Sequence, residues 1–259
     1  MRIKQSICYP LFVSEAINLD TLCQTAAEIG YAAIELWARE DDFEEVVATA
    51  KRHNLVVASM SGHAALRDGL NKQANHDRIE AELIASIDLA AQHGIPGLIC
   101  FSGDRQPGQS EAEAIETVAA GFRRVAGYAE QKGINLNLEL LNSKVTHPGY
   151  QCDHTAWGVA VCERVNSPRV KLLYDIYHMQ IMEGDIIRTI QENIYWIGHF
   201  HTAGNPGRRD LDDTQEINYR GICQAIAETG YDLYVGHEFT PKGDKLEALY
   251  QTFPICDQG

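Results

Sequence analysis

The sequence contains no Cys-x-x-Cys pair and no apolar run long enough to cross a membrane as a helix. Its seven cysteines are an odd number scattered along the chain, which argues against a disulfide framework or a structural zinc site and favours a reducing compartment. The first apolar run is soon interrupted by Pro10, so the amino terminus does not have the pattern of a signal peptide. These absences predict a cytoplasmic protein that makes no membrane contact.

Basic residues are scarce relative to acidic ones. The chain has 22 Lys and Arg against 36 Asp and Glu, which gives a formal net charge of -14 at pH 7. A protein that binds nucleic acid needs a basic surface, and this charge repels a phosphate backbone. The charge therefore argues against a nucleic-acid partner, and a homo-oligomer stays possible.

No Pro/Gly/Ser-rich linker or shift in composition divides the 259 residues, so we expect one domain over 1–259. Strand-length apolar runs alternate with helical patterns, which is typical of a parallel sheet covered by helices. Eight such units in about 250 residues fit a single-domain (β/α)8 TIM barrel. An open doubly wound sheet is the alternative, but the residues after the first strand are not a glycine-rich phosphate loop. The expected strands are 3–8, 31–37, 54–60, 97–101, 134–140, 170–178, 195–201 and 232–237. The expected helices are 18–29, 42–52, 74–93, 110–132, 153–165, one opening at 184–185, 219–229 and 242–253.

Four successive strands of this prediction end in residues that ligate metals. The residues are Glu139, Asp175, His201 and Glu238, and in a barrel the carboxyl ends of the strands carry the active site. Three carboxylates and one imidazole suit Mn²⁺, Mg²⁺ or Co²⁺, with Zn²⁺ possible, better than they suit a structural zinc site. A divalent ion with open positions polarises a carbonyl and the hydroxyl beside it. Glu139 and Glu238 on either side of a substrate would then exchange a proton with its carbon.

Several of these segments resemble the xylose-isomerase-like TIM-barrel superfamily, and within it the hydroxypyruvate isomerases. The resemblance lies in the segments 137–142, 173–178, 199–203 and 216–219 and in the ending 230–243, with its Glu-Phe-Thr-Pro. It implies that the four residues named above bind one divalent ion and that Glu139 and Glu238 carry the proton through an enediolate. It also implies that His178 contacts a substrate oxygen. In one respect the sequence departs from the pattern, because hydroxypyruvate isomerases carry Gln where His201 stands and ketose 3-epimerases carry His.

Three further residues are candidates for substrate binding. His63 follows the third expected strand, Glu35 lies at the end of the second, and Arg208 lies in the loop after His201. An arginine can pair with a substrate carboxylate or hydroxyl, while a surface charge is the plain alternative. Core packing or a hydrogen bond is an equally good explanation for Glu35, and His63 can be a polar strand terminus.

The sequence leaves several functions open. A hydroxypyruvate isomerase, a ketose 3-epimerase and a keto-inositol or dehydroshikimate dehydratase all use the same metal and carboxylates. A phosphodiesterase like endonuclease IV fits less well, because an Asp-x-His pair after the seventh strand is missing and the charge is wrong for DNA. A barrel that only binds its partners is the non-catalytic alternative, against which the complete ligand set argues.

Overall fold

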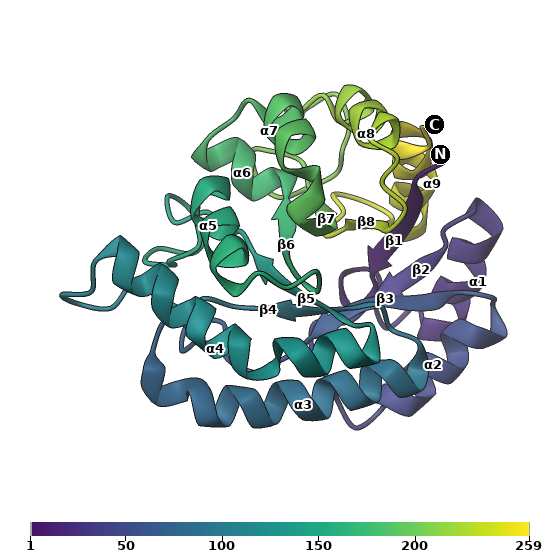
Figure 1. Cartoon of the computed structure of the whole chain (residues 1–259). Helices are drawn as coiled ribbons and strands as arrows, with labels where there is room; N and C mark the ends of the chain where they lie inside the picture. The colour runs from purple at the N-terminus through teal and green to yellow at the C-terminus, as the bar shows by residue number, and fades with distance from the viewer. Residues whose placement is uncertain (1, 259) are drawn as a thin grey trace. The chain divides into compact units, whose positions relative to one another are not determined.

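Eight strands close into a parallel barrel in which each strand hydrogen-bonds to the next one along the chain and β8 returns to β1 (Figure 1). The structure is a computed structural model that describes residues 2–258. It confirms the predicted TIM-barrel class. The strands are β1 (Lys4–Cys8), β2 (Ala33–Glu35), β3 (Val56–Ser61), β4 (Gly97–Cys100), β5 (Asn135–Glu139), β6 (Val170–Asp175), β7 (Ile197–Thr202) and β8 (Tyr234–His237).

Helices follow the strands, and their ends match the capping residues in the sequence. Helix α1 begins after Asn18, whose side chain accepts a hydrogen bond from Thr21 N, and ends at Gly30 in the left-handed conformation. Helix α4 opens with a capping box formed by Ser110 and Glu113. No helix among residues 2–258 is long and apolar enough to cross a membrane. The α-helices are α1 (Leu19–Ile29), α2 (Phe43–Arg52), α3 (His76–His93), α4 (Glu111–Lys132), α5 (Thr155–Val165), α6 (Ile176–Met182), α7 (Ile186–Asn193), α8 (Tyr219–Glu228) and α9 (Lys245–Cys256), and short 3₁₀ turns cover Tyr9–Leu11, Gln73–Asn75 and Ile194–Trp196.

The prediction that strand 170–178 carries both Asp175 and His178 at its end is wrong for His178. Strand β6 ends at Asp175, and the chain turns directly into helix α6. Asp175 itself caps this helix, because its side chain accepts a hydrogen bond from His178 N. His178 therefore lies in the first turn of a helix and not on the strand.

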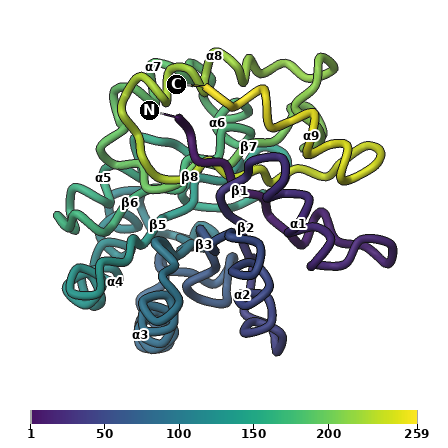
Figure 2. Tube along the Cα trace, turned by 90° about the vertical axis from the view of Figure 1, so that its right-hand side faces the viewer, coloured from purple at the N-terminus to yellow at the C-terminus, as the bar shows by residue number. Residues whose placement is uncertain are grey.

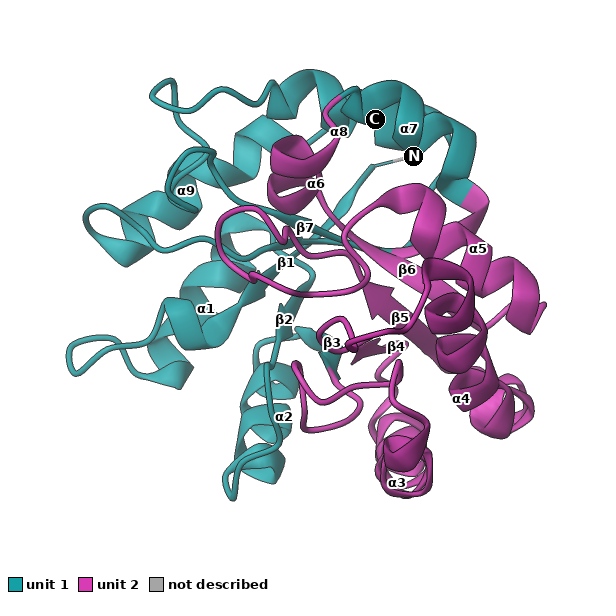
Figure 3. Cartoon of the chain, turned by 90° about the vertical axis from the view of Figure 1, so that its left-hand side faces the viewer, with its two compact units in different colours: residues 1–60, 185–194, 199–259 teal, residues 61–184, 195–198 magenta. Residues whose placement is uncertain are grey.

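The residues divide into two compact units, coloured separately in Figure 3. Unit 1 comprises residues 1–60, 185–194 and 199–259, and unit 2 comprises residues 61–184 and 195–198. In unit 1, β1 pairs with β2 on one side and β8 on the other. The two ends of the chain lie together there (Figure 2), where Ile3 N donates to Gln258 O at 3.2 Å. In unit 2, β5 pairs with β4 and β6, and α4 packs between α3 and α5.

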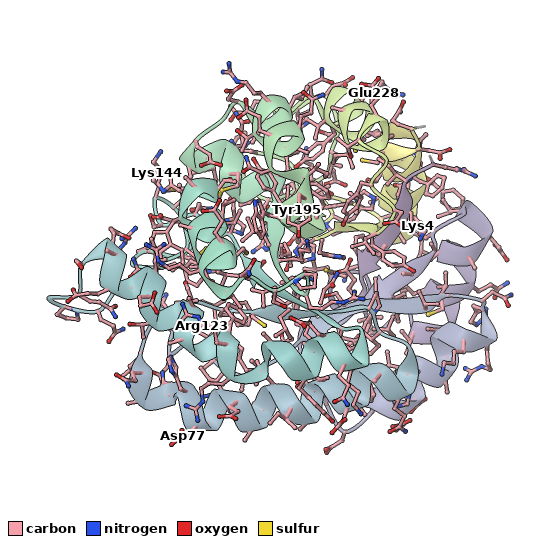
Figure 4. The ribbon with its side chains drawn as sticks, in the orientation of Figure 1. Lys4, Asp77, Arg123, Lys144, Tyr195 and Glu228 are labelled. Carbon is pink, nitrogen blue, oxygen red and sulfur yellow. The ribbon has the colours of Figure 1, made fainter. Side chains whose placement is uncertain are left out.

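The two ends of the strands differ in chemistry. At the amino ends lie Lys4, which is exposed at the start of β1, and Lys171, whose Nζ lies 4.0 Å from the ring centre of the exposed Tyr195 (Figure 4). At the carboxyl ends, by contrast, carboxylates and imidazoles are buried. Burying such groups costs free energy unless they are paired or bind a ligand. The carboxyl ends therefore carry the candidate functional site.

Candidate metal centre and active site

All four predicted metal ligands lie at the carboxyl ends of strands, as the sequence predicts. Glu139 and Asp175 are the last residues of β5 and β6 in unit 2. In unit 1, His201 is the last residue but one of β7, and Glu238 directly follows β8. All four side chains are buried. Active sites of TIM barrels are built at this end of the strands.

In unit 1, the imidazole of His201 lies between two carboxylates. Its Nε2 is 2.9 Å from Glu35 Oε2, and its Nδ1 is 3.3 Å from Glu238 Oε2. Burial lowers the pKa of His201, but Glu238 and Glu35 raise it more, so the pKa lies well above its usual value. The two ring nitrogens thus have separate carboxylate neighbours.

Glu238 is contacted by side chains from two loops of unit 1. Trp37, with 43% of its surface exposed, donates its indole N–H to Glu238 Oε1 at 2.8 Å. The guanidinium of Arg208 forms an ion pair with Oε2 of the same carboxylate. The structure therefore places the predicted substrate-binding Arg208 directly beside a predicted catalytic residue.

Glu35 accepts hydrogen bonds from three side chains of unit 1. Ser6 Oγ donates to Oε1, and Nε2 of His199 and of His201 lie 3.0 and 2.9 Å from Oε2. Burial raises the pKa of Glu35, but the two histidines lower it by more, so its pKa falls below the usual range. Glu35 is 1% exposed, and its carboxylate is already bonded within the barrel interior. These contacts favour a supporting role over direct substrate binding.

In unit 2, Asn142 fixes the orientation of the His178 ring. The backbone N of Asn142 lies 3.1 Å from His178 Nδ1, and its side-chain Nδ2 lies 2.6 Å from the same atom. Because both groups are donors, Nδ1 accepts, and a neutral His178 carries its ring proton on Nε2. That nitrogen is 3.6 Å from Asp175 Oδ2. The imidazole N–H is therefore directed to the same side as the predicted metal ligand Asp175.

Asn142 and Tyr150 anchor the loop that follows β5. The side-chain oxygen of Asn142 accepts from Val145 N and Thr146 N, each at 2.9 Å. The Tyr150 hydroxyl accepts from Ser102 N and donates to the carbonyl of Glu139, both at 3.1 Å. The sequence prediction gave Asn142 no role. Its position three residues beyond Glu139, where a strand ends, is the signal from which one could have been inferred.

His63 is buried in unit 2 and accepts a hydrogen bond from Phe101 N at its Nε2, 2.9 Å away. Its Nδ1 is buried without a hydrogen-bond partner among residues 2–258. Burial lowers the pKa of His63 to about 4. The residue is thus held as a neutral imidazole, which fits either a structural group or a donor to a substrate oxygen.

Within unit 1, Cys8, Glu35 and His201 form a group that can hold a metal ion, because their ligand atoms lie within 4.8 Å of one another. An ion there would have to replace the direct hydrogen bond between Glu35 and His201. The predicted set takes two ligands from each unit, Glu139 and Asp175 from unit 2 and His201 and Glu238 from unit 1. Three carboxylates and one imidazole are hard and borderline ligands, which suit Mn²⁺, Mg²⁺ or Co²⁺.

A closed (β/α)8 barrel with buried acidic residues and histidines at its carboxyl ends defines the class of this protein. Residues 23–252 match the family described as xylose isomerase-like TIM barrel, and the chain belongs to this family. It is 29% identical over 225 residues to the hydroxypyruvate isomerase of Escherichia coli strain K12, covering 85% of this chain and 86% of that protein. It is 30% identical over 186 residues to a putative hydroxypyruvate isomerase of Homo sapiens, and that match spans 72% of this chain and 64% of the human protein's length.

The fold is also found in solved structures. The crystal structure of an AP endonuclease, family 2, from Brucella melitensis superposes with a TM-score of 0.84 at 25% sequence identity. The match covers 98% of this chain and 99% of that one. The barrel therefore extends over nearly the whole sequence in both proteins.

Proposed function

We propose that this protein is a cytoplasmic, metal-dependent isomerase that acts on a small hydroxy-carbonyl compound, with hydroxypyruvate as the first candidate. The observation that carries the proposal is that four buried ligand residues occupy the carboxyl ends of four successive strands. The names of the Escherichia coli and human relatives support the reaction class. We take residues 1–259 as one barrel domain, because the family match runs through both units.

In this proposal Glu139, Asp175, His201 and Glu238 hold one divalent ion, Mn²⁺, Mg²⁺ or Co²⁺. The donor set fits, because three carboxylates and an imidazole neutralise a dication and no thiolate is needed. When bound, the ion would polarise the substrate ketone and the neighbouring hydroxyl, so that the C–H between them becomes acidic.

The protein's own residues then move the proton. One of the two glutamates, Glu139 or Glu238, removes a proton from C3 of hydroxypyruvate, and a proton returned to C2 through the enediolate gives tartronate semialdehyde. Arg208, whose guanidinium pairs with Glu238, would receive the substrate carboxylate. His178, with its N–H on Nε2, donates to a substrate oxygen, and His63 is a further candidate donor.

A ketose 3-epimerase is the second candidate. The residue that favours it is His201, because ketose 3-epimerases resemble this sequence at that position and hydroxypyruvate isomerases carry Gln there. The same two glutamates would act on opposite faces of a single carbon. A dehydratase of a keto-inositol or dehydroshikimate kind uses similar groups but has no observation of its own in its favour.

A substrate panel in D₂O tests the proposal. The protein is treated with a chelator, reloaded with Mn²⁺ and incubated with hydroxypyruvate, several ketohexoses and a keto-inositol, and products are followed by NMR. We expect conversion of hydroxypyruvate with movement of the carbonyl, abolished by chelation. Deuterium at a carbon whose neighbouring carbonyl has not moved, with inverted configuration, would replace the isomerase with the epimerase. No turnover of any compound with Mn²⁺ would overturn both.

A further inference from the structure

We propose that Glu35 is a positioning residue for His201. It holds the ring proton of His201 on Nε2 and thereby leaves Nδ1, on the side of Glu238, to ligate the metal ion. The inference deepens the proposed function and rests on it. It departs from the sequence prediction, in which Glu35 binds substrate.

The hydrogen bonds of Glu35 determine which nitrogen of each histidine is protonated. Oε1 of Glu35 accepts from Ser6 Oγ and Oε2 faces two imidazole nitrogens, so the carboxylate is the acceptor in all three contacts. Both His199 Nε2 and His201 Nε2 lie within 3.0 Å of Oε2. Each of these nitrogens must therefore carry a proton that it donates to Glu35.

The consequence for His201 is a fixed direction for its remaining nitrogen. With Nε2 bonded to Glu35, Nδ1 is 3.3 Å from Oε2 of Glu238, the predicted metal ligand. Histidines that ligate metals usually donate their other ring N–H to a carboxylate or carbonyl, which fixes the tautomer and makes the ligating nitrogen more basic. Glu35 has the position of such a partner.

The Glu35 carboxylate occupies space that a side chain at position 236 would fill, and position 236 is a glycine. Gly236 of β8 is paired in register with Ser6 of β1 and with His201 of β7. A Cβ at position 236 would overlap Glu35 Oε1 and approach His201 Cδ2 to 3.0 Å. The absence of a side chain there allows Glu35 to reach Ser6 and His201 at once, so the arrangement depends on Gly236 as well as on its hydrogen bonds.

The test is Glu35→Gln, with Glu113→Gln as the matched control. Glu113 undergoes the same chemical change in the exposed capping box of α4, away from this network. A glutamine at position 35 removes the negative charge and turns a donor NH2 group either to the histidines or to Ser6, so it cannot accept hydrogen bonds from all three partners. We expect Glu35→Gln to weaken Mn²⁺ binding about 10- to 100-fold, measured by calorimetric titration, and the control to leave it unchanged.

A second measurement reads the tautomer without any metal. Two-bond ¹H–¹⁵N correlations, assigned with the help of His201→Gln, report which ring nitrogen of His201 is protonated in the metal-free protein. With the His201 ring in its neutral form, at a pH above its raised pKa, we expect an Nε2 proton in the wild type and its loss or exchange between nitrogens in Glu35→Gln. If Glu35→Gln does not fold, Gly236→Ala displaces the carboxylate sterically and should shift the same signals and lower Mn²⁺ affinity in the same direction.

The outcomes separate this inference from the proposed function. If the wild type binds no Mn²⁺, the proposed function fails, and the tautomer signals still decide whether Glu35 positions His201. An unchanged His201 tautomer together with wild-type Mn²⁺ affinity in Glu35→Gln, or in Gly236→Ala where that variant is used, would overturn the role of Glu35.

Discussion

Two buried glutamates in unit 1, Glu35 and Glu238, differ in the kind of side chain that contacts them. Glu35 is bonded to Ser6, His199 and His201, all on strands of the barrel. Glu238 is contacted by Trp37 and Arg208, which lie in loops and are partly exposed. Loop residues can move away when a ligand arrives, whereas strand residues are held by the sheet. These contacts support the proposal that Glu238, and not Glu35, is the glutamate that meets the substrate.

We predict that Glu238→Gln reduces turnover by about 10²- to 10⁴-fold, which is the usual contribution of a positioned acid or base. The amide keeps the shape of the side chain and can still bond Trp37 or Arg208, so the fold should survive. Activity is measured with Mn²⁺ at a concentration that saturates the variant, and circular dichroism checks the fold. A folded, metal-saturated variant with most of its activity would exclude Glu238 as a proton carrier.

A second residue-scale prediction concerns His63 and pH. Its pKa is about 4 in the folded protein and about 6.5 when unfolded, so between these values the unfolded chain binds more protons. The stability from His63 is complete above pH 6.5 and is lost as pH falls towards 4, by up to about 3 kcal/mol at roughly 1.4 kcal/mol per pKa unit. Of the neighbouring charges, Glu82 raises the pKa and Arg78 lowers it, and burial outweighs both.

The variant His63→Gln tests this, because its side-chain oxygen can still accept from Phe101 N and does not titrate. Free energies of unfolding from urea titrations between pH 4 and pH 7.5 should fall less steeply in the variant than in the wild type. Equal slopes would mean that His63 titrates in the folded protein as it does in the unfolded chain.

At the residue scale, the sequence predicts individual candidates better than their partners. Glu139, Asp175, His201 and Glu238 are recognisable because each follows a strand-length apolar run. The bonds of Glu35 are not, since its partners His199 and His201 are 164 and 166 residues away along the chain. No local pattern contains that pairing, because it arises only when β2 and β7 face the same barrel interior.

At the scale of elements, Asp175 at the turn from β6 into α6 contacts His178 through both of its carboxylate oxygens. Its Oδ1 caps α6 by accepting from His178 N at 3.0 Å, and Oδ2 lies 3.6 Å from His178 Nε2. One carboxylate thus begins the helix that carries His178 and also belongs to the predicted metal ligands. The strand end and the helix start are coupled through this side chain.

We predict that Asp175→Asn and Asp175→Ala differ in stability but not in metal binding. Asparagine still caps a helix, whereas alanine does not, and loss of a cap costs about 1 kcal/mol. In chelated protein, urea unfolding should therefore show Asp175→Ala to be less stable than Asp175→Asn by roughly that amount. Both variants lose the carboxylate and should bind Mn²⁺ far more weakly than the wild type. Equal stabilities would show that the cap contributes nothing.

The helices differ in how clearly the sequence predicts them. Helices α1 and α4 were predicted because capping residues mark their starts and glycines mark their ends. Helix α6 was missed because it is only seven residues long and continues an apolar strand without a break, and such short runs do not distinguish strand from helix. Its capping residue, Asp175, also ends an apolar run, so the sequence pattern indicates a ligand at a strand end and not a helix start.

At the scale of the molecule, the alternation of strands and helices in the sequence predicts the barrel. It does not predict the geometry of the ligand residues. Each ligand residue lies at the end of a different strand, and the four are spread between residues 139 and 238. Local sequence fixes where each strand ends. The parallel pairing of β5 with β6 in unit 2, and of β7 with β8 in unit 1, brings the two ends of each pair to one edge.

This spread leads to a prediction about stability. Because an unfolded chain does not gather four ligands from such distant positions, the ion should bind the folded protein alone and stabilise it by mass action. At a free Mn²⁺ concentration of 100 times the Kd this amounts to about 2.7 kcal/mol. For a chain of this size that corresponds to a rise in Tm on the order of 5–10 °C. The ion would also offset repulsion among three buried carboxylates.

Differential scanning calorimetry of chelated protein titrated with Mn²⁺ measures the effect. The Tm should rise with Mn²⁺ concentration in the wild type and in Glu113→Gln, whose carboxylate lies in the capping box of α4. It should stay nearly constant in Asp175→Asn, because that variant keeps the helix cap and lacks one ligand. A wild-type Tm that is the same with and without Mn²⁺ would show that the four residues form a structural cluster and do not bind an ion.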